Sequence, residues 1–346
     1  MAWVQSFPRR EAQAISLIGV AHMLSHLYFL ALAPLLIPIT TDLRITALQW
    51  GTAFSAYAIT TGVLQTPMGL LVERIGGRPV LMGGLLLNAA ALFFMGWYVT
   101  DFFGLVLLMT IAGIGNSVFH PADYSLISSS IAEDRLGTAY SIHNFAGHMG
   151  FLAGPILSTT LEPFVGWRGA LMIIGGMGMV MTLVLLVCRH MISEGTEVKK
   201  KAPIAERLRD LVTSRPVLLF FLFFMGSSLG NFGVTQFSVA AFHEMYGFPK
   251  AAAVVGLTAY QIATLSLVLP GGILADRLDR YDGMLMGGFG IAAVAVFIIG
   301  VTVLPFWLVV CLLILAGSMR GMVTASRDVA VRHIAGEIPV GTVFAF

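Results

Sequence analysis

The sequence predicts an all-α membrane protein with about ten membrane-spanning helices. Of its 346 residues, 57% are hydrophobic and only 11% are charged, and the mean hydropathy is +0.87. A soluble domain usually contains about 25% charged residues. Apolar runs of about 20 residues, long enough for a helix to cross a bilayer, recur from Ala14 to Thr324. Open sheets would leave backbone groups unsatisfied in lipid, and the runs lack the alternation of a barrel strand.

The expected spans follow these apolar runs in order. Arg9 and Arg10 precede the first run, but that run is too long for a signal peptide and lacks a cleavage site. Most connections are short, so neighbouring helices should be antiparallel. The spans cover residues 14–39, 47–71, 80–99, 103–127, 137–161, 168–187, 217–242, 251–275, 283–303 and 306–328.

One long connection, 188–216, divides the chain into an N-terminal six-helix bundle, 1–187, and a C-terminal bundle, 217–346, of four helices and the start of a fifth. Three lysines, 199–201, are followed by apolar residues at helical spacing: Ile204, Leu208, Leu211 and Val212. This pattern predicts a cytoplasmic linker that contains an amphipathic helix lying on the membrane surface.

The basic residues predict the orientation, because short loops rich in Lys and Arg stay in the cytoplasm. With a cytoplasmic N-terminus, the opposite side holds only Arg44, Arg168 and Lys250. The formal charge of +2 reflects this topology and gives no nucleic-acid patch. Cys188 and Cys311 behave as small hydrophobes, without the spacing of a disulfide framework or a metal site.

An internal repeat predicts two related halves. The segment 69–74, GLLVER, follows the second helix, and 272–277, GILADR, follows the eighth. A second match, at nearly the same offset, pairs 137–140, GTAY, with 341–344, GTVF. Two matches in one register favour duplicated six-helix halves.

The loop 69–78, GLLVERIGGR, resembles the signature between helices two and three of the major facilitator superfamily, and 272–280 is a degenerate copy. The resemblance implies two pseudosymmetric bundles, with about ten of an expected twelve helices present. It also implies a multi-pass protein of a bacterial inner membrane that moves a small-molecule substrate through the lipid bilayer, without a cofactor. The copies depart from the family pattern at Glu73, where Asp is commoner, and at Pro79 and Asp279.

In that family the motif forms a cytoplasmic gate. The resemblance implies that Glu73 faces the N-terminus of helix eleven, where free amides carry partial positive charge, and that Asp276 meets the start of helix five near Leu136 and Gly137. The arginines would pair with carboxylates or lipid phosphates, or merely set topology. The gate residues are Gly69, Glu73, Arg74 and Arg78 in the first copy and Gly272, Asp276, Arg277 and Arg280 in the second.

Ionisable side chains at membrane depth are functional candidates. Arg320 falls near the middle of the last span, where it suits an anionic substrate group or a proton-carrying carboxylate. The alternative is a structural pair with Asp123 or Asp328. In the fourth span His120 and Asp123 lie three residues apart, on one helix face, and can exchange a proton. Alternatively, both hold a kink at Pro121.

The His-Pro-acid pattern around Pro121 resembles the fosmidomycin-resistance-like exporters. Further polar candidates are His22 and His26, one turn apart, and Asn144 and His148, also one turn apart. No Cys, Asp or Glu accompanies either pair within its helix, so no metal site is expected. Asn231, Gln236 and Gln261 add hydrogen-bonding groups in the C-terminal half. Packing histidines and interhelical amide contacts are the structural alternatives.

Gly147, Gly150 and Gly154, followed by Pro155, form a small-residue stripe that permits close helix packing and partly resembles the antiporter motif of helix five. The sequence therefore favours a secondary transporter that exports a small organic solute in exchange for protons, by alternating access. The alternatives are proton-coupled uptake of an organic acid and a non-transporting sensor. An enzyme would need a catalytic or metal cluster at the membrane surface, and no such spacing appears.

The match of 341–344 with the start of helix five places the end of the sequence at the first turn of helix eleven. We therefore expect a truncated product or fragment that lacks two helices. A natural ten-helix variant and completion by oligomerisation are the alternatives.

Overall fold

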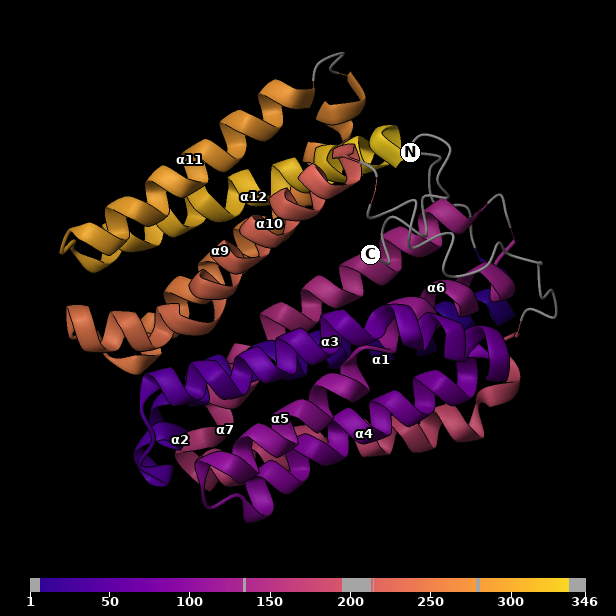
Figure 1. The fold of residues 1–346 in the computed structure, drawn as a ribbon, viewed down its shortest axis with the longest axis horizontal. Helices are drawn as coiled ribbons and strands as arrows, with labels where there is room; N and C mark the ends of the chain where they lie inside the picture. The colour runs from indigo at the N-terminus through magenta and orange to yellow at the C-terminus, as the bar shows by residue number, and fades with distance from the viewer. Residues whose placement is uncertain (1–6, 133–134, 195–212, 214, 278–280, 336–346) are drawn as a thin grey trace. The chain divides into compact units, whose positions relative to one another are not determined.

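A computed structural model describes residues 7–132, 135–194, 213, 215–277 and 281–335 (Figure 1). These residues are helical apart from short connections, and they contain no strand. The chain divides into two compact units, unit 1 at 1–198 and unit 2 at 199–346. Seven segments of the described helices are long and apolar enough to cross a membrane. The all-helical fold class is thereby confirmed.

Unit 1 begins with a nearly continuous helical rod. Helix α1 (Arg9–Ala31) passes through a short 3-10 turn, η1 (Ala33–Leu35), into α2 (Leu36–Leu43). Pro34 lies in that turn, where its missing N–H interrupts the α-helical pattern. Helix α3 (Ala47–Ile75) starts with a capping box in which Thr46 and Gln49 bind each other's backbone N–H groups, and α4 (Gly77–Tyr98) follows.

The predicted fourth span is broken into two helices. Helix α5 (Phe102–Asn116) ends five residues before Pro121, and α6 (Phe119–Ser130) begins after Ser117 and Val118. Proline lacks the N–H that would bond to the carbonyl of Ser117 and its ring clashes with that carbonyl. The sequence predicts one span over 103–127, and the structure divides this segment one turn before Pro121.

Helix α7 (Leu136–Val187) contains two predicted spans in one run of 52 residues. Gly166 separates them, with φ 68° and ψ 173°, a conformation that a residue with a Cβ rarely adopts. The short 3-10 helix η3 (Arg189–Met191) follows. The expected amphipathic helix of the linker falls largely on 195–212, outside the described residues.

Helices α1 and α7 pack closely because the glycine stripe of α7 faces α1. A Cβ at Gly150 would stand 2.1 Å from the carbonyl oxygen of Met23, and one at Gly154 would stand 2.6 Å from that of Leu27. Only glycine allows such backbone approach. The stripe thus has the packing role that its spacing predicts.

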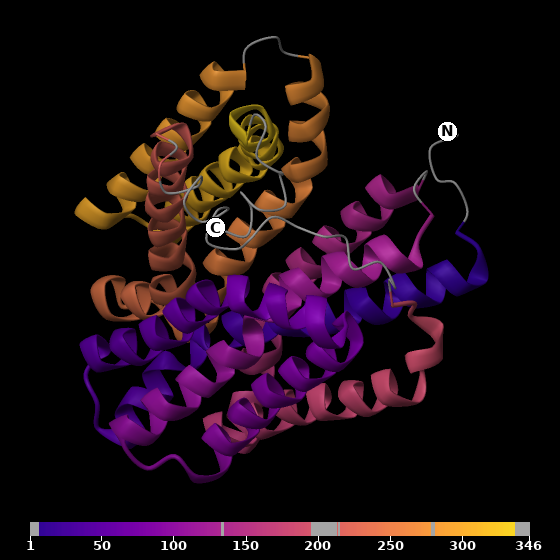
Figure 2. The ribbon, with the colours of Figure 1, turned by 45° about the vertical axis from the view of Figure 1, so that its right-hand side comes forward.

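Unit 2 contains α9 (Arg215–Tyr246), α10 (Lys250–Arg277), α11 (Tyr281–Val301) and α12 (Phe306–Ala335). Helices α10 and α12 lie side by side in both views (Figures 1 and 2). A Cβ at Gly317 would come within 2.3 Å of the carbonyl oxygen of Tyr260. In unit 1, a Cβ at Gly113 of α5 would come within 2.5 Å of the carbonyl oxygen of Tyr57 in α3. The two contacts recur at the offset of the sequence repeat, so the halves share a packing pattern.

Candidate functional site

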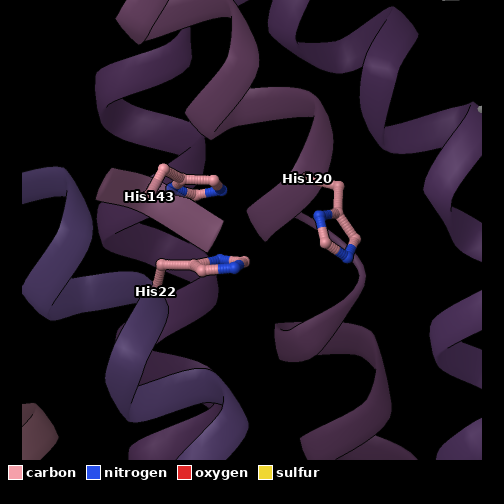
Figure 3. Close-up of side chains that lie close together, drawn as sticks. All are labelled: His22, His120 and His143. Carbon is pink, nitrogen blue, oxygen red and sulfur yellow. The ribbon is translucent and has the colours of Figure 1, made fainter. Parts of the chain in front are cut away.

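Four ionisable side chains meet inside unit 1, and we refer to them as the histidine cluster. They come from three helices: His22 from α1, His120 and Asp123 from α6, and His143 from α7. Figure 3 shows the rings of His22 and His143 lying one above the other, with His120 facing them from across the gap. The ring centroids of His22 and His143 are 3.7 Å apart, and those of His22 and His120 are 5.4 Å apart.

Asp123 is the acidic centre of this cluster. One of its oxygens, Oδ2, lies 3.0 Å from Nδ1 of His22 and 3.8 Å from Nε2 of His143. The exposed fractions of the His22, Asp123 and His143 side chains are 2%, 0% and 0%, whereas His120 is exposed. A buried carboxylate surrounded by imidazoles can take part in proton or cation binding.

Several atoms of the cluster have no hydrogen-bond partner. They are Nδ1 of His22, both ring nitrogens of His143 and both carboxylate oxygens of Asp123. The 3.0 Å approach of His22 to Asp123 lacks hydrogen-bond geometry and becomes an ion pair only when His22 is protonated. Buried polar atoms without partners are energetically unfavourable, so such a group points to a ligand, an ion or a proton.

The fold positions the cluster through two local features. The break before α6 places His120 and Asp123 in its first turns, on the face that the three-residue spacing predicts. Gly147 leaves room for the imidazoles of α1, since a Cβ there would stand 2.9 Å from Nε2 of His22 and 3.1 Å from Cε1 of His26.

Aromatic and hydroxyl groups extend the cluster along α6 and α7. The ring of Tyr124 lies 5.6 Å from that of His143 and 5.2 Å from that of Tyr140, measured between centroids. The hydroxyls of Tyr140 and Ser128 are hydrogen-bonded at 2.7 Å. This side of the cluster is therefore polar and aromatic.

The other candidates on α1 and α7 lie beside the cluster. The His26 ring is 4.5 Å from that of His22 and 4.2 Å from that of Phe151. His148 contacts the carbonyl oxygen of Asn144 through Nδ1 at 2.9 Å, and the side chain of Asn144 is exposed.

Sequence analysis missed His143. Its signal was present, because His143, Gly147, Gly150 and Gly154 follow one another at intervals of one helical turn and so share a face of α7. The glycine stripe that marks contact with α1 thus also marks the histidine that meets His22.

The candidates of unit 2 occupy α9, α10 and α12. Arg320 is half-buried on α12, and Gln261 is buried on α10. Asn231 of α9 accepts a hydrogen bond from the hydroxyl of Tyr260 at 3.1 Å, which is an interhelical contact of the kind considered for these amides. Gln236 is also buried. The side chain of Asp328, one suggested partner of Arg320, lies outside the description.

The first copy of the gate motif is described in unit 1. Gly69 packs against Pro121, with a Cβ position 3.7 Å from the proline Cβ, and Glu73 and Arg74 are exposed. Arg78 donates to Oε2 of Glu194 at 3.1 Å and to the carbonyl oxygen of Arg189 at 2.8 Å.

The carboxylate pairing expected for these arginines is thus present at Arg78. The side chains of Asp276 and Arg277 and the burial of Gly272 are not described, and Arg280 and the proposed partner of Glu73 in residues 336–346 lie outside the described residues. The contact of Asp276 with Leu136 and Gly137 falls outside them too, because the side chains involved are not described.

The histidine cluster also contains the residues that could hold a metal ion. One ligand atom from each of His22, His120 and His143 lies within 4.8 Å of the others. The histidine pairs seen in the sequence each lie within one helix, whereas this group is assembled from three helices.

Comparison with known proteins identifies relatives across nearly the whole chain. The family model described as "Major Facilitator Superfamily" matches residues 18–346. The chain is 27% identical over 176 residues to the "Probable L-galactonate transporter" of Escherichia coli (strain K12), covering 51% of this chain and 38% of that protein. It is 23% identical over 274 residues to the "Fosmidomycin resistance protein" of the same strain, covering 76% of this chain and 65% of that protein.

The chain thus spans between about a third and two thirds of the length of these curated relatives. A solved structure of a bacterial homologue of the human lysosomal transporter Spinster, inward-facing and unoccupied, matches with a TM-score of 0.82 at 14% identity. The match covers 98% of this chain and 78% of that one. At this identity the likeness concerns the fold alone.

Proposed function

The chain belongs to the Major Facilitator Superfamily, and on this basis we propose that it forms part or all of a secondary transporter that moves a small organic solute across a bacterial inner membrane. In this proposal the N-terminus is cytoplasmic, as the distribution of Lys and Arg indicates. Substrate reaches each side in turn as two helical bundles alternate in access. Residues 1–187 and 217–346 are the proposed bundles, with 188–216 as their linker.

The observation that carries the proposal is the histidine cluster. Asp123 and His143 are fully buried in helical segments long and apolar enough to span a membrane, 102–130 and 142–187, and their side-chain polar atoms lack hydrogen-bond partners. A charged group at such depth is costly unless it serves a pathway for substrate or ions. A purely structural cluster would be expected to satisfy its polar atoms.

The proposed solute is a small anion. Relatives are named as transporters of L-galactonate, of galactarate and D-glucarate, and of nitrate, all of them anionic. Arg320 supplies a guanidinium on an apolar helix, and its planar fork suits a carboxylate, a nitrate or a phosphonate. We propose that Arg320 binds the anionic group, with Asn231 and Gln261 as further polar groups of the pathway.

Export coupled to protons completes the proposal. Relatives named for fosmidomycin resistance, multidrug resistance and nitrite extrusion support the outward direction. Intramembrane Asp and His side chains are typical of proton pathways, which supports the proton as coupling ion. Proton-coupled uptake of an organic acid is the second candidate, favoured by the sugar-acid transporters among the relatives.

Transport by the reconstituted chain tests the proposal. Proteoliposomes with an imposed pH gradient would be supplied with L-galactonate, D-glucarate, nitrite or fosmidomycin, while an internal pH indicator reports proton movement. We expect one of these anions to drive proton flux and to accumulate against its own gradient. The direction of accumulation relative to the pH gradient separates export from uptake. Binding of an anion without flux, both in this chain and in one extended by the last two helices of a relative, would contradict transport and favour a sensor.

A further inference from the structure

We propose that His22, His120 and His143 bind one transition-metal ion of the zinc type, with Asp123 as their carboxylate partner. This goes beyond the proposed function, because solute transport requires no metal. The three imidazoles belong to α1, α6 and α7, and one ligand atom of each lies within 4.8 Å of the other two. Within the described residues, no other set of three His, Cys, Asp or Glu side chains meets this condition.

The spacing of the ligand atoms fits an ion after a small closure. Zinc binds imidazole nitrogen at about 2.0–2.1 Å in a tetrahedral arrangement, which places neighbouring ligand atoms about 3.4 Å apart. Atoms separated by at most 4.8 Å reach that spacing by moving roughly 1 Å, which side-chain rotation provides. Figure 3 shows the space between the stacked rings of His22 and His143 and the ring of His120, where the ion would lie.

The unsatisfied atoms provide an independent argument. Nδ1 of His22 and both ring nitrogens of His143 are buried without a hydrogen-bond partner, as are both oxygens of Asp123. Each imidazole offers one nitrogen to a cation, so an ion would satisfy one ring nitrogen of His143, and the nearby carboxylate would offset part of its charge. The 3.0 Å separation of Asp123 Oδ2 from Nδ1 of His22 also matches the carboxylate–histidine arrangement that orients metal ligands.

The burial pattern indicates a site with an open position. His22 and His143 are buried, whereas His120 is exposed. An ion can therefore arrive from the side of His120. Three protein nitrogens leave a fourth position for water or an anionic solute, as in zinc sites that keep one position open.

Cobalt binding to the purified full chain tests this site. The chain would carry an affinity tag without histidines, be treated with a chelator, and then be titrated with Co²⁺, whose visible absorption reports tetrahedral coordination. We expect one Co²⁺ per chain, displaced by one equivalent of Zn²⁺. His120→Gln and His143→Gln should each weaken Co²⁺ binding by at least about tenfold, a loss comparable with that from removing a supporting partner of a metal ligand.

The double variant His190→Gln/His243→Gln is the matched control. It removes two exposed histidines outside the cluster, and it should keep the wild-type affinity and spectrum. Loss of binding in this control, or unchanged binding in His120→Gln, would show adventitious surface binding and overturn the proposal. Because His120 is exposed, its variant should fold, and size-exclusion chromatography verifies this.

The wild-type chain supplies a second measurement that depends on no variant. Zn²⁺ should raise its Tm, because a ligand that binds only the folded state stabilises it. Absence of both the Tm shift and the tetrahedral spectrum would overturn the proposal. No solute is present in either assay, so failure here leaves the transport proposal to its own test.

Discussion

Nδ1 of His22 lies 3.0 Å from an oxygen of Asp123, although the first residue belongs to α1 and the second to α6. Close packing of α1 against α7 helps to set this approach, since Gly147 leaves the space that the His22 ring occupies. Helix packing and site geometry are thus coupled. Changes in the glycine stripe should affect the histidine cluster as well as stability.

Asp123→Asn should abolish pH-driven solute accumulation while leaving the chain folded. The amide has a similar size but carries neither a proton nor the negative charge that faces His22 and His143. We expect accumulation to fall by about tenfold or more, whereas solute exchange without a gradient persists. Glu244→Gln, at an exposed carboxylate of α9, is the control. Normal accumulation in Asp123→Asn would remove this residue from the coupling mechanism.

Arg320→Ala and Arg320→Lys should both lose transport of an anionic solute. Lysine keeps the charge but lacks the planar fork that binds an oxyanion through two hydrogen bonds. Initial rates at several solute concentrations provide the measurement, and we expect at least about a tenfold fall in both variants. Cys311→Ser, at an exposed position of the same helix, is the control. Wild-type rates in the lysine variant would contradict bidentate recognition, and wild-type rates in the alanine variant would contradict any role.

Gly150→Ala should destabilise unit 1. The new methyl group would stand 2.1 Å from the carbonyl oxygen of Met23, which belongs to helix backbone and has little freedom to move. Overpacking of this kind costs about 1–3 kcal/mol, so the Tm in detergent should fall by several degrees. Gly176→Ala in the second half of α7 meets nothing within 4 Å and should leave the Tm unchanged or raise it slightly. Equal Tm values for the two variants would argue against close α1–α7 packing in solution.

The sequence predicted the features that depend on composition and spacing. Apolar runs predicted the helices, and the repeat predicted two related halves, with which the matching contacts of Gly113 with Tyr57 and of Gly317 with Tyr260 agree. Apolar runs and repeats are local or periodic features of the sequence, so they can be recognised without knowing how the helices pack. The shared face of His120 and Asp123 follows from helical geometry for the same reason.

The site itself was only partly predictable. His143 was not predicted as a site residue, because its role depends on contacts with residues of other helices. These residues are His22 of α1 and Asp123 of α6. The break at Ser117 and Val118 was not predicted, because the hydrogen bond that Pro121 cannot make and the clash of its ring lie one turn before the proline. The ion pair between Arg78 and Glu194 could not be predicted, since nothing in the sequence around Glu194 relates it to Arg78.

Gly76 should be important for the turn between α3 and α4. Its φ of 93° is unfavourable for a residue with a Cβ, and a Cβ there would stand 2.7 Å from Oε1 of Glu194. That oxygen accepts the backbone N–H of Arg78 at 3.0 Å, and Oε2 accepts the guanidinium. Gly76→Ala should therefore strain the turn and displace the carboxylate that holds Arg78, which together should destabilise the chain by about 1–3 kcal/mol.

A double-mutant cycle with Glu194→Ala separates the two contributions. In the Glu194→Ala background the clash is absent, so Gly76→Ala should lower the Tm only by the backbone strain, less than in the wild type. Gly83→Ala, at a position on α4 that meets nothing within 4 Å, should not lower the Tm in either background. If Gly76→Ala lowers the Tm equally with and without Glu194, the carboxylate does not rest against this turn.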